Sequence, residues 1–232
     1  MKQELSLPVI AHIQTDFPAK FGIPKQSGLV KDLRGIIVFE PPFRDANAVR
    51  GLEGFSHLWL IWHFSDNRDK PWSPTVRPPR LGGNTRLGVF ATRSPFRPSR
   101  LGLSAVKLDR IAFTEHSGPV LHVSGADLMD GTPIVDIKPY LPGDAIGDAS
   151  GGFAQAGRGD GLHVVFPQEL LNIVPDEKRG ALLGVLQEDP RPAYQDDPSR
   201  RYGFTFAGLE IRFTVNSNTL TVIEVEENQP IR

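Results

Sequence analysis

Short apolar runs bounded by Gly, Pro or Asp recur through the first 140 residues and predict strands rather than helices. The predicted strands cover residues 8–14, 36–39, 56–64, 87–92, 103–113, 120–126 and 133–137. A short helix over 43–53, with Asp45 or Asn47 as its N-cap, interrupts the series. Strands that follow one another in this way favour antiparallel pairing into a barrel or rolled sheet over a parallel α/β sheet.

The run SHLWLIWHF at 56–64 is almost wholly apolar and aromatic, which predicts a strand buried on both faces. Its two tryptophans, Trp59 and Trp62, are expected mainly in core packing. Stacking on a base or an adenine ring is the alternative use.

A change of pattern divides the chain. Residues 142–161 are rich in Gly, Ala and Asp without periodicity, which is typical of a linker. Beyond it, the pattern predicts strands and two helices in a small α+β domain with an antiparallel sheet, at residues 162–166, 167–173, 176–187, 203–206, 209–215 and 219–225. Asn216-Ser217-Asn218 predicts a hairpin turn between the last two strands. The expected organisation is a mainly β chain: a small antiparallel barrel at 1–142, a linker at 143–161 and the α+β domain at 162–232.

Composition narrows the classes of function. The 23 Gly and 21 Pro among 232 residues favour short elements joined by turns. The absence of cysteine excludes disulfides, thiolate metal sites and thiol nucleophiles, and the six His show no metal-ligand spacing, so no metal is expected. The first residues lack a signal-peptide core and no run of 18 apolar residues occurs, so we expect a cytoplasmic protein without a membrane segment.

Charge is segregated along the chain although the formal net charge is only −1. The stretch from Lys70 to Leu108 contains no Asp or Glu, and its cations are Lys70, Arg77, Arg80, Arg86, Arg93, Arg97, Arg100 and Lys107. Arginine pairs with phosphate at two points, so a phosphate-bearing ligand such as RNA is one interpretation. A solvated loop that pairs with acidic residues elsewhere is the other, and the stretch alone does not favour either.

The common nucleotide-binding motifs are absent from the sequence. No Gly-rich turn joins a first strand to a helix, RLGGNTRLG at 80–88 lacks the Lys of a phosphate-binding loop, and no GxSxG occurs. An adenosine cofactor would therefore bind on a fold other than the doubly wound sheet.

Five blocks in a fixed order carry a resemblance to a known family: KFGIPKQSGLV (20–30), AVRGLEGFSHLWLI (48–61), TVRPPRLGGNTRLGVFATRSPFRPS (75–99), DLMDGTPIVDIKPYLP (127–142) and DPRPAYQ (189–195). Together they resemble the TsaA-like family of S-adenosylmethionine-dependent tRNA N6-adenine methyltransferases, which modify threonylcarbamoyladenosine beside the anticodon in tRNA of the threonine type. The sequence departs from the family at Ser99 and Arg100, where Asn and Pro are usual. We expect the backbone path to survive at Ser99 because Ser can replace Asn in a turn, whereas Arg100 in place of proline should relax the backbone and add one cation.

The resemblance implies a homodimeric β-barrel enzyme that binds S-adenosylmethionine and acts on tRNA. The implied cofactor positions are Pro24, Lys25, Gln26, Ser65, Asp66, Arg93, Leu103, Asp130, Gly131, Thr132 and Pro133. Since all of them precede the linker, the fragment 1–142 is expected to bind the cofactor without the C-terminal domain. A non-catalytic RNA-binding barrel and a methyltransferase for a small molecule are the alternatives.

The substrate side is less specific. Asp136 is the candidate polar group near the adenine amine, and it alternates with Lys138 and Tyr140 on one strand face; a structural Asp–Lys pair is the competing interpretation. The residues expected to contact tRNA are Arg77, Arg80, Arg97, Lys138, Tyr140, Arg191 and Tyr194.

Overall fold

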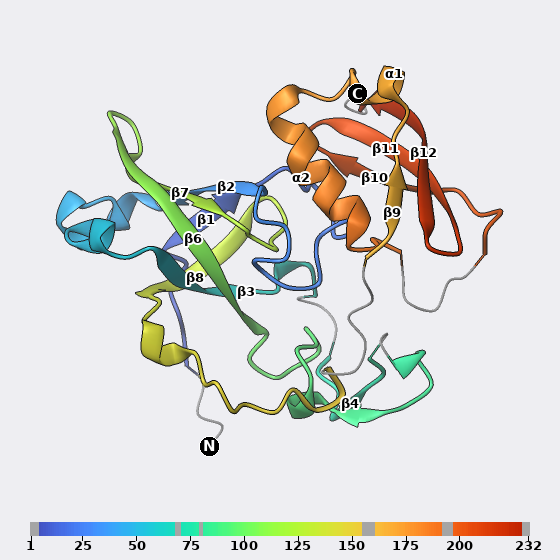
Figure 1. Cartoon of the computed structure of the whole chain (residues 1–232). Helices are drawn as coiled ribbons and strands as arrows, with labels where there is room; N and C mark the ends of the chain where they lie inside the picture. The colour runs from blue at the N-terminus through green and yellow to red at the C-terminus, as the bar shows by residue number, and fades with distance from the viewer. Residues whose placement is uncertain (1–4, 68–70, 79–80, 155–160, 192–196, 229–232) are drawn as a thin grey trace.

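The first unit of the molecule is a closed antiparallel barrel, as the sequence predicts. The computed structural model describes residues 5–67, 71–78, 81–154, 161–191 and 197–228. The barrel runs in the order β1-β2-β7-β6-β3-β8 (Figure 1). Closure comes from β1, where Ala11 pairs with Phe39 on one side and with Ile134 on the other. The strands are β1 (Ala11–Gln14), β2 (Arg34–Phe39), β3 (His57–His63), β6 (Leu101–Thr114), β7 (Gly118–Ser124) and β8 (Thr132–Pro139).

Strand β3 buries one face, so the prediction of two buried faces is wrong. Leu58 and Leu60 point into the barrel core with no exposed surface, while their neighbours along the strand are partly exposed. Trp59 lies on the outer face, where its Nε1 donates a hydrogen bond of 2.8 Å to Asp144 and its ring centroid lies 5.0 Å from that of Tyr140. The sheet curls into a barrel, and the outer side of this strand is left without a second layer.

Two local predictions in the barrel unit fail. The segment predicted as a helix over 43–53 forms separate 3-10 turns at Pro41–Phe43, Ala46–Val49 and Leu52–Gly54. Gly51, with φ of 85°, interrupts the series in a conformation that a continuing right-handed helix excludes. The expected capping role of Asp45 is confirmed, since its side chain accepts from the Asn47 N–H.

The predicted strand at 87–92 is also shorter than expected. Within it only Leu87–Gly88 (β5) forms a strand, which pairs with Thr75–Val76 (β4) outside the barrel. A 3-10 turn over Val89–Ala91 follows, with Val89 buried. The apolar residues of this segment therefore form a turn in which the Val89 side chain is buried.

The second unit has a four-stranded sheet in the order β10-β11-β12-β9. Here β9 runs parallel to β12, whereas an antiparallel sheet was expected throughout. The hairpin prediction is confirmed by Ser217, which takes a φ of 53° between β11 and β12. The elements are β9 (His163–Val165), α1 (Gln168–Leu171), α2 (Asp176–Gln187), β10 (Tyr202–Phe206), β11 (Leu209–Asn216) and β12 (Thr219–Glu227).

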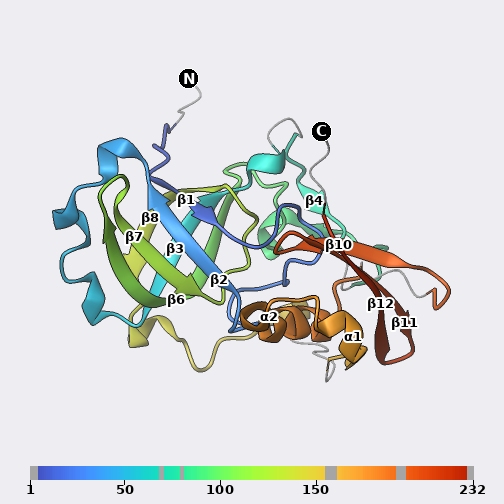
Figure 2. The same ribbon diagram turned by 90° about the horizontal axis from the view of Figure 1, so that it is seen from above.

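The long loop between β1 and β2, residues 15–33, belongs to the core of the second unit. Phe17, Val30 and Leu33 are buried in one cluster with α2 and the strands β10–β12. Figure 2 shows the loop running beside α2 and β10 before the chain returns to the barrel. This packing changes the expectation for the fragment 1–142, because removal of the second unit would expose all three side chains.

Candidate functional site

A cavity of about 410 Å³ lies where the barrel meets the loop 15–33. Aromatic side chains dominate its wall: the rings of Trp62 and Phe64 meet edge to face with centroids 4.3 Å apart, and Phe96 joins them. Gly102 makes room for Trp62, because a Cβ there would lie 2.3 Å from the indole. The lining residues are Lys20, Ile23, Trp62, His63, Phe64, Ser65, Asp66, Pro95, Phe96, Asp127, Leu128, Met129 and Thr132. The volume and the apolar walls are typical of a small-molecule site.

Hydrogen bonds join both ends of the loop 15–33 to the segment 125–130. At the first end, the Thr15 N–H donates to the Asp130 carboxylate (2.9 Å) and the Thr15 hydroxyl to the Leu128 carbonyl (3.0 Å). At the second end, the Leu33 carbonyl accepts from the Gly125 N–H (2.9 Å), and five residues earlier the Gly28 N–H donates to the Gly125 carbonyl (2.8 Å). These bonds bring the loop and the turn 130–133 to one side of the barrel.

Asp127 is held in the cavity wall by a short relay of hydrogen bonds. Trp62 Nε1 donates to the Ser104 hydroxyl (3.0 Å), which donates to Asp127 Oδ1 (2.6 Å). Burial raises the pKa of Asp127 above its ordinary value, and the Ser104 bond, the backbone N–H groups of Asp127 and Ser27 and the charge of Arg93 oppose that rise. A partly buried carboxyl therefore lies between apolar walls and a nearby cation.

Three of the expected cofactor positions line the cavity directly: Ser65, Asp66 and Thr132. Asp66 also forms an ion pair of 3.1 Å with Lys20, which connects the loop to the end of the aromatic strand. The Thr132 hydroxyl donates to the Met129 carbonyl (2.7 Å) and so fixes the turn.

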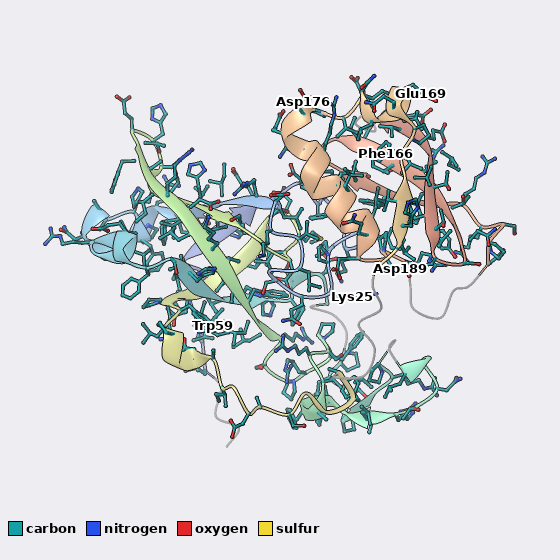
Figure 3. The ribbon with its side chains drawn as sticks, viewed as in Figure 1. Lys25, Trp59, Phe166, Glu169, Asp176 and Asp189 are labelled. Atoms are coloured by element: carbon teal, nitrogen blue, oxygen red, sulfur yellow. The ribbon has the colours of Figure 1, made fainter. Side chains whose placement is uncertain are left out.

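The other eight expected positions are not among the lining residues of the cavity. Pro24 is buried, while Lys25 and Gln26 are exposed; Figure 3 labels Lys25 between the barrel and the second unit. In the turn, Gly131 has φ of 72° and its N–H donates to the Ile13 carbonyl (2.8 Å). Asp130 and the buried Pro133 stand on either side of it.

Arg93 and Leu103 differ in how they reach the site. Arg93 is exposed and lies close enough to affect the pKa of Asp127. Leu103 is 55% exposed on the outer side of β6, opposite to the inward Ser104. A contact of Leu103 with a ligand in the cavity would have to come from its main chain.

The departure from the family pattern at Arg100 changes the backbone. Arg100 has φ of 51°. Proline, usual at this position in the family, is locked near −65° and could not adopt this angle, which agrees with the relaxed backbone expected for Arg100.

Asp136 lies outside the lining of the cavity. Its carboxylate pairs with Lys138 Nζ at 3.2 Å, with both side chains about half exposed, which is the structural Asp–Lys pair of the competing interpretation. Tyr140 packs beside Trp59 on the outer face of the barrel. The structure therefore groups Asp136, Lys138 and Tyr140 with the outer surface and not with the cavity.

The expected tRNA contacts differ in accessibility. Arg77 is exposed after β4, and Arg97 donates to the Thr92 carbonyl (3.3 Å). Arg191 is only 10% exposed at its side chain and forms a two-point pair with Asp189 (2.9 and 3.0 Å). Its guanidinium is thus committed to its own turn. Arg80 and Tyr194 lie outside the described residues.

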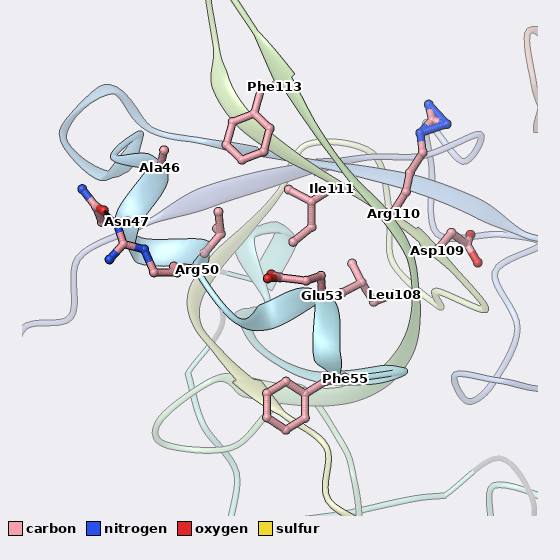
Figure 4. A pocket seen from close by; sticks show the side chains of 11 residues that line it. Ala46, Asn47, Arg50, Glu53, Phe55, Leu108, Asp109, Arg110, Ile111 and Phe113 are labelled. Carbon is pink, nitrogen blue, oxygen red and sulfur yellow. Dashed lines mark hydrogen bonds between the residues drawn. The ribbon is translucent and has the colours of Figure 1, made fainter.

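A second, larger cavity of about 620 Å³ lies on another part of the barrel, between the 3-10 turns at 46–54 and the far end of β6 (Figure 4). Val49, Leu108 and Ile111 supply apolar surface, and Arg50 and Glu53 add charge. None of its lining residues belongs to the expected site, so we assign the ligand to the smaller cavity.

The described residues also bear on metal binding and on membrane-spanning helices. Within the described ranges, no group of three or more His, Asp or Glu side chains could hold a metal ion. Over the same ranges, none of the helices combines the length and apolarity needed to cross a membrane.

The smaller cavity fits a ligand with both an aromatic ring and charged groups. Trp62, Phe64 and Phe96 offer faces and edges to a planar ring, and the Asp127 carboxyl lies in the wall. Arg93 does not line the cavity, but its charge acts on that carboxyl. S-adenosylmethionine combines an adenine with an ammonium and a carboxylate, so the residues present fit it. Fold and site together define a ligand-binding β-barrel protein.

Comparison with known proteins identifies the family. The family model for the tRNA-methyltransferase O N-terminal domain matches residues 12–144, and that for the TrmO C-terminal domain matches 162–228. The chain belongs to the tRNA-methyltransferase O family and is a methyltransferase. The resemblance seen in the sequence is thereby confirmed.

Individual relatives agree with this assignment. The tRNA (adenine(37)-N6)-methyltransferase of Escherichia coli is 41% identical over 226 residues, covering 94% of this chain and 96% of the relative. A Pseudomonas aeruginosa protein named "Putative S-adenosylmethionine-dependent methyltransferase RcsF" is 40% identical, with 90% and 91% covered. The crystal structure of TrmO from P. aeruginosa is 33% identical, covers 98% of this chain and 99% of its own, and has a TM-score of 0.79.

Sequence reasoning missed Asp127, Ser104 and the lining role of Phe64 and Phe96. The signal for Asp127 was its spacing of three from Asp130 in a segment already noted. For Ser104 the sequence offered only inward alternation along a strand, which does not distinguish a polar contact from a tolerated small residue.

Proposed function

We propose that this protein transfers a methyl group from S-adenosylmethionine to N6 of threonylcarbamoyladenosine at position 37, beside the anticodon of tRNA of the threonine type. The observation that carries the proposal is the aromatic cavity in which Ser65, Asp66 and Thr132 meet from two separate segments. Relatedness to the E. coli enzyme over 94% of the chain supports the base and the nitrogen. The threonylcarbamoyl group and the tRNA species come from the family resemblance.

In this proposal the bound cofactor supplies an electrophilic methyl group on a sulfonium. The chain itself contributes position and exclusion of water: Trp62, Phe64 and Phe96 hold a planar ring and keep the reacting centre dry. Arg93 binds the carboxylate of the methionine end. Asp136, paired with Lys138 on the outer face, keeps only the role of a candidate surface contact.

The substrate base enters from a single-stranded loop, which costs less unpairing than a base in a duplex. The cations of the segment 70–108, with exposed Arg77 among them, hold the phosphates. Arg191 holds the turn at 189–191 in shape through Asp189. Tyr194 keeps its proposed role as a tRNA contact. We also propose that the protein acts as a homodimer in the cytoplasm.

The direct test uses purified full-length protein, S-adenosylmethionine labelled in the methyl group, and tRNA from cells that lack the gene. Nucleoside mass spectrometry should detect the methylated form of threonylcarbamoyladenosine, and RNase treatment before the reaction should abolish labelling. A matched tRNA without the threonylcarbamoyl group should remain unlabelled. Methylation of both tRNAs would refute the finer substrate, while label in a small molecule would refute tRNA as substrate. Light scattering of the same sample tests the homodimer.

A further inference from the structure

The Asp127 carboxyl is a feature of the cavity to which neither the resemblance nor the comparisons assign a role. It follows β7 and precedes the turn 130–133. The Ser104 hydroxyl, itself only 2% exposed as a residue, donates to its Oδ1 at 2.6 Å. Ser104 in turn accepts from the Trp62 indole. This relay fixes the carboxyl in the wall, so its position is built into the barrel.

Among the described residues, the charged side chains nearest to Asp127 leave its carboxyl without an ion pair of the kind that Asp66 forms with Lys20. Arg93, exposed and outside the lining of the cavity, is near enough for its charge to oppose the rise that burial causes in the pKa of the carboxyl. Lys20 and Asp66, which line the cavity together with Asp127, form an ion pair with each other at 3.1 Å. A carboxylate facing an apolar cavity is costly unless a cation approaches it. Because Asp66 already has Lys20, Asp127 is the carboxylate better placed to receive a cation from a ligand.

The amino-acid end of S-adenosylmethionine presents an ammonium and a carboxylate on one carbon atom. The Asp127 carboxyl in the cavity wall, with the charge of Arg93 acting on it, complements that arrangement. We propose that Asp127 binds the α-ammonium group of the cofactor, next to Arg93, which binds the carboxylate. The inference rests on the proposed function, since it takes S-adenosylmethionine as the cofactor.

The test compares three ligands by calorimetric titration of the full-length protein and of Asp127→Asn. S-adenosylmethionine and S-adenosylhomocysteine both carry the ammonium, whereas 5′-methylthioadenosine lacks the amino-acid end. Loss of a charge-assisted hydrogen bond should weaken the first two by about tenfold to a hundredfold. The affinity for 5′-methylthioadenosine should stay within about twofold by the same reasoning. Asp148→Asn, in the exposed segment after the barrel, serves as a matched control and should bind all three ligands like the wild type.

Each other outcome overturns the assignment. Weaker binding of S-adenosylmethionine alone would mean that the carboxylate faces the sulfonium. Equal weakening of all three ligands would mean that Asp127 only supports the cavity through Ser104 and Ser27, and no change would remove it from the site. If the wild type binds none of the three ligands, the proposed cofactor itself fails, which is a different result from failure of the Asp127 assignment.

A ligand-side comparison keeps the proposal testable should Asp127→Asn fold poorly. Wild-type protein is titrated with S-adenosylhomocysteine and with its analogue in which a hydroxyl replaces the ammonium. The amine should bind at least about tenfold more tightly, because only the cation gains a charge-assisted bond. Equal affinities would overturn the proposal without any variant.

Discussion

The two hydrophobic cores of this protein are built from the chain in different ways. The barrel core draws on segments between Ala11 and Ile137 that are all parts of the barrel unit. The second core draws on 162–225 and also on Phe17, Val30 and Leu33, which lie more than a hundred residues earlier in the sequence. The loop that carries Pro24, Lys25 and Gln26 is therefore held by the C-terminal unit. We infer that this unit supports the cofactor site as well as any contact with tRNA.

The largest expected effect comes from substituting two residues that are four positions apart in the sequence but belong to different cores. Phe17, 1% exposed and 5.3 Å from the Phe206 ring, belongs to the second core, whereas Ile13, fully buried, belongs to the barrel. Phe17→Ala should reduce the free energy of unfolding by about 3–5 kcal/mol and weaken cofactor binding. Urea unfolding followed by far-ultraviolet circular dichroism and by tryptophan fluorescence measures it. Since the three Trp lie in the barrel unit, at 59, 62 and 72, their fluorescence reports that unit.

The matched variant Ile13→Ala should reduce the free energy of unfolding by about 2–5 kcal/mol. Because Ile13 belongs to the barrel core, the loss should appear first in the tryptophan fluorescence. If Phe17→Ala left the free energy of unfolding within about 0.5 kcal/mol of the wild type, Phe17 would not be a core residue of the second unit.

A smaller effect is expected where the loop approaches β10. Gly22 has φ of 95°, and a Cβ there would lie 2.4 Å from the Phe204 ring. Gly28 has φ of 77° with nothing within 4 Å of a Cβ, so it isolates the backbone strain. Gly28→Ala should cost about 1–2 kcal/mol, and Gly22→Ala about 1–3 kcal/mol more from the steric clash. Thermal unfolding of both variants measures the difference; equal costs would show that Phe204 does not constrain the loop.

The ion pair between the loop and α2 should contribute less. Lys178 Nζ lies 2.7 Å from Asp16, with side chains 27% and 16% exposed, whereas Lys138 and Asp136 form a pair that is 61% and 46% exposed. Lys178→Met should cost about 1–2 kcal/mol because it leaves a largely buried carboxylate without its partner. Lys138→Met should cost less than about 0.5–1 kcal/mol. Urea unfolding at low and high salt distinguishes them, and equal costs would contradict the buried character of the first pair.

The smallest effect concerns binding of tRNA. Arg77 is exposed, whereas Arg191 is committed to Asp189. If Arg77 contacts a phosphate, Arg77→Ala should reduce the slope of log affinity against log salt by about one. Arg191→Ala should lower affinity through the shape of its turn and leave the slope unchanged. Filter binding across a salt series measures both slopes, and the reverse pattern would exchange the roles of the two arginines.

The hydrophobic periodicity, together with the Gly, Pro and Asp residues that bound the apolar runs, predicted most of the fold. Strands such as β11 and the helix α2 were predictable because alternation and a leucine stripe record one-sided burial, as Ile211, Phe213 and Leu182 show. The segment 43–53 was not, since helical periodicity cannot distinguish a helix from 3-10 turns broken at Gly51. Nor did local pattern indicate that Phe17 and Val30 pack against a helix far along the chain.

The candidate site was predictable where a family motif marks it and not where tertiary contacts create it. Ser65, Asp66 and Thr132, which the resemblance implies as cofactor positions, line the cavity. Asp127 and Ser104 became visible only when β6 and the segment after β7 were brought within hydrogen-bonding distance. The burial of Arg191 likewise depends on packing that the Pro-flanked turn does not encode.

The most direct test of the central claim is native-state hydrogen exchange of Leu182→Ala in the full-length chain, with the barrel variant Leu121→Ala as its control; both side chains are fully buried. The amide of Gly28, bonded to the Gly125 carbonyl, reports the loop. If the C-terminal unit holds the loop, Leu182→Ala should accelerate exchange at Gly28 together with α2, leave the amides of β7 protected and weaken S-adenosylmethionine binding. Unchanged protection at Gly28 with α2 exchanging faster would show that the loop is held by the barrel alone, and the account would be wrong.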